Sequence, residues 1–218
     1  MIGVYFYRKE VFMAIFFTSD LHICHNKDFI YQNRGFNSIE EHNKALVRNW
    51  NETVSPEDTV YVMGDMIMGD NRHEALDYIK QLNGTIVMVR GNHDTDSKFK
   101  DYLNECPNID KDSVNNEYVK VLKIGKRCYY LSHYPTIIGD ILFENKKQRL
   151  PVTVCLHGHT HSKDRFEFIE YGCYNVGLDA HDMRPVSLDE VREDVHNEVQ
   201  ERMKEKLENA QSDESSQE

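Results

Sequence analysis

The sequence lacks a long uninterrupted apolar run. None of its 218 residues lies in a stretch approaching the ~20 apolar residues that a membrane-spanning helix needs. Residues 1–17 are rich in apolar side chains, but a charged triplet at 8–10 divides them and no small-residue cleavage site follows. We therefore expect neither a membrane span nor a secretory signal. Met13 is an alternative start, in which case residues 1–13 form an N-terminal extension.

Paired cysteines are also missing. The five cysteines are an odd number, widely scattered and without a Cys-x-x-Cys pair; they are Cys24, Cys106, Cys128, Cys155 and Cys173. This pattern indicates reduced thiols, so we expect a cytoplasmic protein. No internal repeat and no long linker rich in Pro, Gly or Ser divides the chain, which predicts a single domain.

The chain lacks an excess of basic residues, because its acidic residues outnumber them. The formal net charge is −11, and residues 187–218 hold eleven acidic and four basic residues, so the first 186 residues carry only −4. Proteins that grip long nucleic acid normally present a basic face. The sequence shows no such face, and we expect no extended nucleic-acid surface.

The sequence does contain an alternation of short apolar runs with helical patterns, and this predicts an α/β fold. Several of the apolar runs end in polar residues. They predict strands at 14–20, 59–65, 85–94, 118–133, 152–159 and 166–177, where 118–133 is a hairpin that turns at Gly125-Lys126. The helical patterns lie at 38–54, 71–84 and 187–208.

The predicted helices carry further signals. Ser38 and Glu41 have the spacing of a capping box, and Gly84 is placed to stop the second helix. The third helix repeats an apolar residue every four positions, which favours a single helix over a coiled coil; these residues are Val191, Val195, Val199, Met203 and Leu207. The acidic segment 209–218 is expected to be disordered.

The most unusual stretch, residues 156–164, reads LHGHTHSKD. His157, His159 and His161 alternate over five positions directly after an apolar run. In an extended chain, alternation at period two turns all three rings to one side, where they can meet a common centre. The alternative is a histidine-rich surface loop, and this stretch alone does not decide between the two.

Metal-competent residues also follow the other predicted strands. The strand endings read SDLH, MGD, RGNHD, LSH and HGHTH. In open α/β sheets, binding sites lie outside the carboxyl ends of the strands, so these endings are expected to reach the same rim. Five such endings favour one shared metal site over five unrelated turns.

These endings, in this order, resemble the motif series of the calcineurin-like metallophosphoesterases. They span residues 20–161, and the chain is similar to small bacterial and phage members that begin with a strand and an SD-x-H-x-x-H segment. The resemblance implies a four-layer α-β-β-α sandwich over residues 14–186, followed by the helix at 187–208. It also implies a phosphate-ester hydrolase with two divalent metals at the sheet edges.

The resemblance implies the metal ligands as well. One metal would take Asp20, His22 and His161, the other would take Asn92, His133 and His159, and Asp65 would bridge them. Carboxylate, amide and imidazole ligands without thiolate suit Mn²⁺, which we favour, and also Fe, Zn²⁺ or Ni²⁺. Two such cations about 3.5–4 Å apart can hold a bridging water and clamp a phosphate for in-line attack. His157 falls outside the motif and is expected to pack against its neighbours.

His93 is similar in position to the family's general acid on the leaving-group side. Two readings of Asp94 stay open: a carboxylate that orients His93, or the N-cap of a following helix. The residues expected to contact substrate are His25, Asn26 and Arg34. Arg34 and Arg90 both suit a phosphate, but a surface ion pair is the alternative for each.

Two other polar residues near these motifs receive no catalytic role. Cys24 lies between His22 and His25, and we expect it to pack in the interior because its neighbours complete the ligand set. His181 is expected to be structural.

One departure from the family narrows the substrate. Protein Ser/Thr phosphatases follow Gly-Asp with a VDRG-type extension whose arginine grips the monoester, whereas residues 63–71 here read MGDMIMGDN. We therefore expect a small-molecule or nucleotide phosphodiester, with a small-molecule monoester as the alternative. A nuclease fits the charge poorly. A non-catalytic metal-binding module is disfavoured because the ligand series and His93 are all present.

Overall fold

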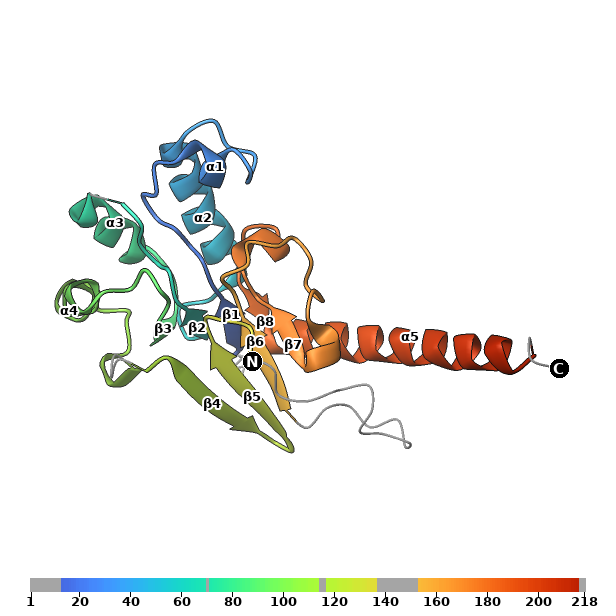
Figure 1. Ribbon diagram of the computed structural model, residues 1–218. Helices are drawn as coiled ribbons and strands as arrows, with labels where there is room; N and C mark the ends of the chain where they lie inside the picture. Colours follow the sequence, from blue (N-terminus) through green and yellow to red (C-terminus); the bar gives the residue numbers. More distant parts are fainter. Residues whose placement is uncertain (1–12, 70, 114–116, 137–152, 216–218) are drawn as a thin grey trace, which may run out of the picture.

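Two four-stranded sheets form the centre of the protein in the computed structural model (Figure 1). The structure describes residues 13–69, 71–113, 117–136 and 153–215. Apart from Met13, the expected N-terminal extension at 1–13 lies outside the described residues.

The first sheet has the strand order β3-β2-β1-β8. Its strands are β1 (Ile15–Thr18), β2 (Thr59–Met63), β3 (Thr85–Val89) and β8 (Val186–Ser187). The first three are mutually parallel, and β8 runs antiparallel to β1. The three predicted strands in this sheet are confirmed. Each is shorter than expected because its last polar residues leave the ladder and turn across the sheet edge.

The second sheet has the order β4-β5-β6-β7. Its strands are β4 (Val119–Ile124), β5 (Arg127–Ser132), β6 (Thr153–His157) and β7 (Cys173–Asn175). The predicted hairpin is confirmed, since Ile124 pairs with Arg127 across the turn and Gly125 adopts a φ of 65°. β5, β6 and β7 are parallel, so their carboxyl ends also share one edge.

The strand predicted at 166–177 is wrong over its first part. A 3-10 helix occupies Ile169–Tyr171, and only Cys173–Asn175 pairs with β6. The local backbone explains this: Gly172 has a φ of 84°, and the amide of Cys173 donates to the carbonyl of Phe168. Hydrogen bonds within this turn therefore replace strand pairing.

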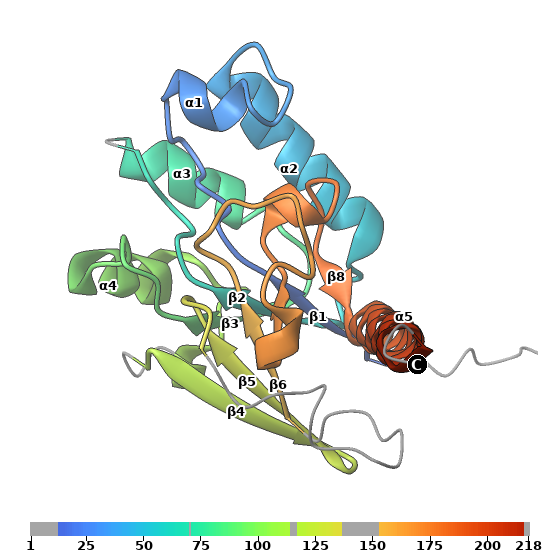
Figure 2. The same ribbon diagram turned by 45° about the vertical axis from the view of Figure 1, so that its right-hand side comes forward.

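Helices cover one face of the first sheet (Figures 1 and 2). They are α2 (Ile39–Thr53), α3 (Arg72–Ile79) and α4 (Asp96–Glu105). The short helix α1 (Asp28–Tyr31) lies beside α2, farther from the strands. The Ser38 side chain caps α2 by accepting from the amide of Glu41, as its spacing predicts. α3 ends before Gly84 because the chain tightens into a turn, in which the amide of Leu82 donates to the carbonyl of Ile79. The sequence did not predict α1, and it indicated a helix in the place of α4 only through one of the two readings of Asp94.

Each face of the first sheet has its own hydrophobic core. On the helical side, Trp50 of α2 is 1% exposed and packs with Leu76 of α3 and Tyr102 of α4. On the other side, Phe17 and Tyr129 stack between the two sheets with ring centroids 6.3 Å apart. The predicted fold class, an α/β sandwich of two sheets with flanking helices and a C-terminal helix, is confirmed.

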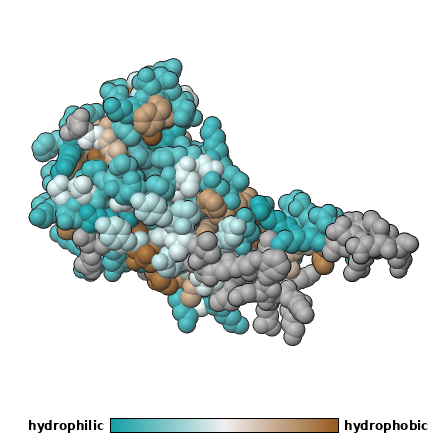
Figure 3. Space-filling model, viewed as in Figure 1, coloured by the Kyte–Doolittle hydropathy of each residue, from teal (hydrophilic) through white to brown (hydrophobic). Residues whose placement is uncertain are grey.

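The C-terminal helix α5 (Leu188–Ser215) begins beside β8 and projects beyond the sandwich (Figures 1 and 2). It is longer than the expected 187–208 and runs through part of the segment expected to be disordered. No glycine or proline interrupts it, and an exposed ion pair between Lys204 and Glu208 adds helical pairing at i,i+4. The described part of α5 has a largely hydrophilic surface in Figure 3. No helix in the described ranges is long and apolar enough to cross a membrane.

The apolar stripe of α5 should stabilise the protein only where it meets the sandwich. Val195 is 3% exposed, whereas Leu207 lies on the projecting part and is 59% exposed. We expect Val195→Ala to lower the free energy of unfolding by about 1–3 kcal/mol, and Leu207→Ala to change it by less than about 0.5 kcal/mol. Urea unfolding of the two variants measures this, and equal losses would contradict the packing of α5.

Candidate metal centre

The carboxyl ends of the parallel strands bring the predicted ligands to one rim. Asp20 follows β1, Asp65 follows β2 and Asn92 follows β3. From the second sheet, His133 follows β5, and both His159 and His161 follow β6. Residues far apart in the sequence therefore meet because parallel strands end at the same sheet edge.

Two groups of these side chains could each hold a metal ion. Asp20, His22 and His161 form one group, and Asp20, Asp65 and His133 form the other, with the ligand atoms of each within 4.8 Å of one another. In the first group, the Nε2 atoms of both histidines lie 3.8 Å from Asp20 Oδ1. In the second, His133 Nε2 lies 3.5 Å from Asp65 Oδ2.

Asn92 and His159 join the second group at His133. Asn92 Oδ1 lies 2.7 Å, and His159 Nδ1 lies 3.1 Å, from His133 Nε2. His133 Nδ1 lies 2.8 Å from the carbonyl of Met63, which can only accept, so this nitrogen carries a proton. Its Nε2 lone pair then faces the lone pairs of Asn92 Oδ1, an arrangement that repels unless a proton or a cation lies between them.

Two further atoms at the centre are buried without a hydrogen-bond partner: Asp20 Oδ1 and His22 Nε2. Burial would raise the pKa of Asp20, but the nearby His22 side chain and the charges of the neighbouring histidines hold it below its usual range. Burial lowers the pKa of His22 and of His159. Asp20 is thus an ionised carboxylate beside the neutral imidazoles of His22 and His159, and this donor set fits a divalent cation such as Mn²⁺, Fe²⁺ or Zn²⁺.

The backbone at the centre is strained. Positive φ angles between 52° and 70° occur at five of the seven predicted ligands, which are Asp20, His22, Asp65, His159 and His161. A non-glycine residue in this region costs on the order of 1–3 kcal/mol, and such strain clusters at functional sites. These backbone conformations set the directions of the ligand side chains. Because they are strained, packing elsewhere in the protein must maintain them.

A glycine allows the two sheets to approach each other at the centre. A Cβ on Gly158 would overlap Asp20 Oδ2 and Ser19 Oγ. The close approach lets the amide of His159 donate to Asp20 Oδ2 at 2.8 Å. The glycine of the HGHTH motif is thus needed for space, because any side chain there would displace the Asp20 carboxylate.

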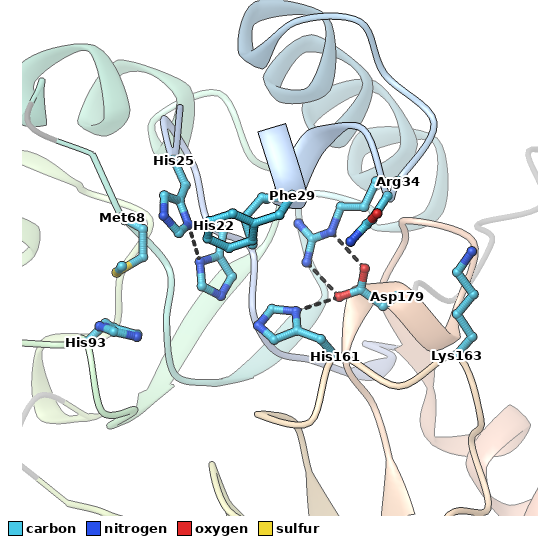
Figure 4. A pocket seen from close by; sticks show the side chains of 11 residues that line it. His22, His25, Phe29, Arg34, Met68, His93, His161, Lys163 and Asp179 are labelled. Carbon is cyan, nitrogen blue, oxygen red and sulfur yellow. Dashed lines mark hydrogen bonds and ion pairs between the residues drawn. The ribbon is translucent and has the colours of Figure 1, made fainter. Parts of the chain in front are cut away.

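A buried ion pair supports His161, and the sequence did not predict it. Asp179 Oδ2 accepts from His161 Nδ1 at 2.9 Å, so His161 turns its Nε2 toward Asp20. Arg34 donates to both carboxylate oxygens of Asp179, from Nε to Oδ1 at 2.9 Å and from Nη2 to Oδ2 at 2.8 Å (Figure 4). Asp179 lies just past the predicted strand at 166–177, so the strand-end pattern that found the other residues could have found it.

The predicted phosphate contact of Arg34 is wrong in this arrangement. Its side chain is 2% exposed, and its remaining donors bond the carbonyls of Asp20 and Leu21 and the ring of His42. No guanidinium N–H is left for a substrate. Arg34 therefore holds Asp179 and the backbone of Asp20 in place.

His93, the predicted proton donor, lines the cavity beside the centre. Its side chain is 46% exposed on the cavity wall, with Nε2 4.0 Å from Asp65 Oδ2, and its amide donates to Asp65 Oδ1 at 2.9 Å. Neither reading of Asp94 holds, because Thr95 caps α4 and no bond joins Asp94 to the His93 ring in the described residues. Instead, Asp94 Oδ2 accepts from the amides of Asp65 and Gly91.

Two of the candidate ligands, His22 and His161, line a cavity of about 650 Å³ (Figure 4). His25 lines it, as predicted, with Nδ1 3.0 Å from His22 Nδ1. Burial, followed by the charge of His22, lowers the pKa of His25 to about 4. Asn26 is exposed and is not among the lining residues, so its predicted substrate contact is not supported.

The remaining predicted residues lie away from the cavity. Arg90 forms an ion pair, the alternative to a phosphate contact, with its Nη2 2.7 Å from Asp96 Oδ1. Cys24 is buried, and burial raises the pKa of its thiol to about 11. His157 is fully buried with its ring against Phe168, and His181 is buried with Nε2 bonded to a main-chain carbonyl.

The chain matches one protein-family model over most of its length. The model is described as the calcineurin-like phosphoesterase superfamily domain, and it matches residues 13–177. The chain is also similar to individual proteins, of which three are described next. An uncharacterized protein of Methanocaldococcus jannaschii, MJ1445, is 32% identical over 180 residues, which cover 80% of this chain and 87% of that one. The Gene 66 protein of Mycobacterium phage D29 is 32% identical, covering 84% and 96%. The crystal structure of a protein of unknown function from Aquifex aeolicus, AQ665, aligns with a TM-score of 0.59 at 25% identity, covering 83% and 98%.

The ion pair behind His161 should control metal affinity without touching the metal. We expect Asp179→Asn to weaken Mn²⁺ binding about 10- to 100-fold, because residues that orient a ligating histidine have effects of this size. Isothermal titration calorimetry measures it, with Asp182→Asn, an exposed carboxylate three residues on, as the matched control. Unchanged affinity in a folded Asp179→Asn variant would remove Asp179 from the centre.

Proposed function

The chain belongs to the calcineurin-like phosphoesterase superfamily, and from this premise we propose that it is a metal-dependent phosphodiesterase acting on small or nucleotide diesters. The observation that carries the proposal is the convergence of a buried, ionised Asp20 with neutral histidines and unpartnered buried atoms. Such a donor set lies at the strand ends and opens directly into a cavity.

We assign the ligands to two divalent cations, with Mn²⁺ favoured. One takes Asp20, His22 and His161, the other takes Asn92, His133 and His159, and Asp65 lies between them. The proximity of Asp65 both to Asp20 and to His133 supports a bridging role. When bound, two such ions supply a water nucleophile of lowered pKa and stabilise the charge that develops on the phosphate.

The protein's own residues then orient and protonate the substrate. His93 lies on the cavity wall, and the bond from its amide to Asp65 fixes its main chain relative to the centre. Its exposed ring can deliver a proton to the departing alkoxide oxygen. Asp94 holds the amides of Asp65 and Gly91, and so fixes the loops that carry the carboxylate and the proton donor.

The charge of the cavity favours a diester over a monoester. A monoester dianion needs more positive charge than a diester monoanion does, and a guanidinium is the usual partner. Arg34 is the lining guanidinium, and its donors are all engaged within the protein. Lys163 is the other lining cation, and it lies on the exposed outer part of the wall. The part of the cavity beside the candidate ligands therefore suits a singly charged phosphate.

Removing the bridging carboxylate should remove the metals. We expect Asp65→Asn to lower Mn²⁺ content at both positions and to reduce diester turnover by at least about 100-fold, because it withdraws a charge shared by both ions. Inductively coupled plasma mass spectrometry measures the metal content, and circular dichroism checks that the variant is folded. Asp77→Asn, an exposed carboxylate on α3, is the control. Two full equivalents of metal in the Asp65→Asn protein would contradict the bridging assignment.

The role of His93 should depend on the leaving group. A nitrophenolate departs readily without a proton, whereas an alkoxide needs one near neutral pH. We therefore expect His93→Ala to slow a dialkyl or nucleoside diester by about 10²–10⁴-fold, and bis(p-nitrophenyl) phosphate by much less, with metal content retained. Equal losses on both substrates would make His93 a positioning group. A strong wild-type preference for p-nitrophenyl phosphate would instead indicate a monoesterase.

A further inference from the structure

The cavity extends well past the candidate ligands. At about 650 Å³ it falls in the size range of pockets that enclose whole small molecules, and it is larger than a phosphate group needs. Histidines of the centre form one part of its lining. Another part comes from α1 and the chain that follows it, with Phe29, Ile30 and Asn33, and from Lys163 two residues after His161. Figure 4 shows Phe29 beside His22 and His25, and Lys163 on the far side of Asp179.

Phe29 presents an aromatic ring to this space. It is 63% exposed, the most exposed aromatic side chain among the described residues. Its ring contact in the described residues is with His25, at 5.8 Å between centroids and nearly perpendicular. Ile30 beside it is only 6% exposed, so the apolar surface that α1 offers the cavity comes mainly from the Phe29 ring. An exposed ring at a cavity wall is the feature on which nucleobases stack.

Lys163 offers a positive charge that the protein leaves free. It is exposed, and none of the described residues forms a hydrogen bond or ion pair with it. Arg34, the other cation of the lining, is committed to Asp179. In a chain whose first 186 residues carry a net charge of −4, an uncommitted lysine in the cavity favours an anionic group on the ligand.

We propose that the substrate is a nucleotide diester whose nucleobase stacks on Phe29 and whose second phosphate contacts Lys163. The inference rests on the proposed phosphodiesterase function and narrows its substrate. Asn33 can pair with a base edge through its amide, a contact for which the alkyl chain of a simple alkyl diester has no partner. A nucleobase with a further phosphate uses the ring, the amide and the cation together.

The test uses p-nitrophenyl diesters with one leaving group and different retained alcohols. They are the ethyl ester, the octyl ester, the thymidine 5′-phosphate ester, and the same thymidine ester carrying a 3′-phosphate. With the Mn²⁺-loaded protein, we expect kcat/KM to rise at least about tenfold from ethyl to thymidine, since one stacked base contributes this much or more. The 3′-phosphate should raise it again.

Two variants assign the gains to residues. Phe29→Ala should reduce the thymidine-to-ethyl ratio about tenfold, and Lys163→Ala should remove the gain from the 3′-phosphate. Tyr171→Ala, an aromatic residue 44% exposed but outside the cavity lining, and Lys44→Ala, an exposed lysine of α2, should leave both ratios unchanged.

A binding measurement separates this inference from the proposed function. Calorimetric titration of thymidine 3′,5′-bisphosphate into metal-free protein should show binding that both Phe29→Ala and Lys163→Ala weaken. Hydrolysis of the ethyl ester with no thymidine preference, or a preference for octyl, overturns the nucleotide proposal and leaves the phosphodiesterase standing. If no ester is hydrolysed, the proposed phosphodiesterase activity is contradicted. The bisphosphate titration then tests only whether Phe29 and Lys163 form a nucleotide-binding site.

Discussion

The rest of the centre depends on the buried carboxylate of Asp20. It is 1% exposed, one of its oxygens accepts the amide of His159 from the second sheet, and the other points at two histidine rings without a bonded partner. Removing an ionised carboxylate from water costs several kcal/mol unless opposite charge or donors compensate. Asp20 therefore ties the two sheets together at the point where a cation would offset most of this cost.

The surrounding structure follows from holding that charge in place. Gly158 leaves room for the carboxylate, and Arg34 bonds the carbonyl of Asp20 while gripping Asp179 behind His161. Five of the predicted ligands have left-handed backbone conformations, and each adds conformational strain energy. Because a domain is only marginally stable, well-packed cores must offset this strain. The two cores on either side of the first sheet supply that packing.

The sequence predicts those features that local patterns determine. The parallel strand endings deliver all seven predicted ligands to one rim, and the cap of α2 and the hairpin at Gly125 follow from short signals. The sequence does not reveal the partners that folding brings to a side chain. In the sequence, Arg34 is a candidate phosphate contact. In the folded chain its guanidinium donates instead to Asp179, which lies 145 residues away in the sequence. The carboxylate of Asp94 likewise meets two main-chain amides that only the tertiary structure places beside it.

The most direct test of the central claim is anomalous diffraction from crystals of the protein grown with Mn²⁺. The account predicts two anomalous peaks, one among Asp20, His22 and His161 and one among Asn92, His133 and His159, with Asp65 contacting both. A single peak, or peaks away from the strand ends, would contradict the two-metal centre.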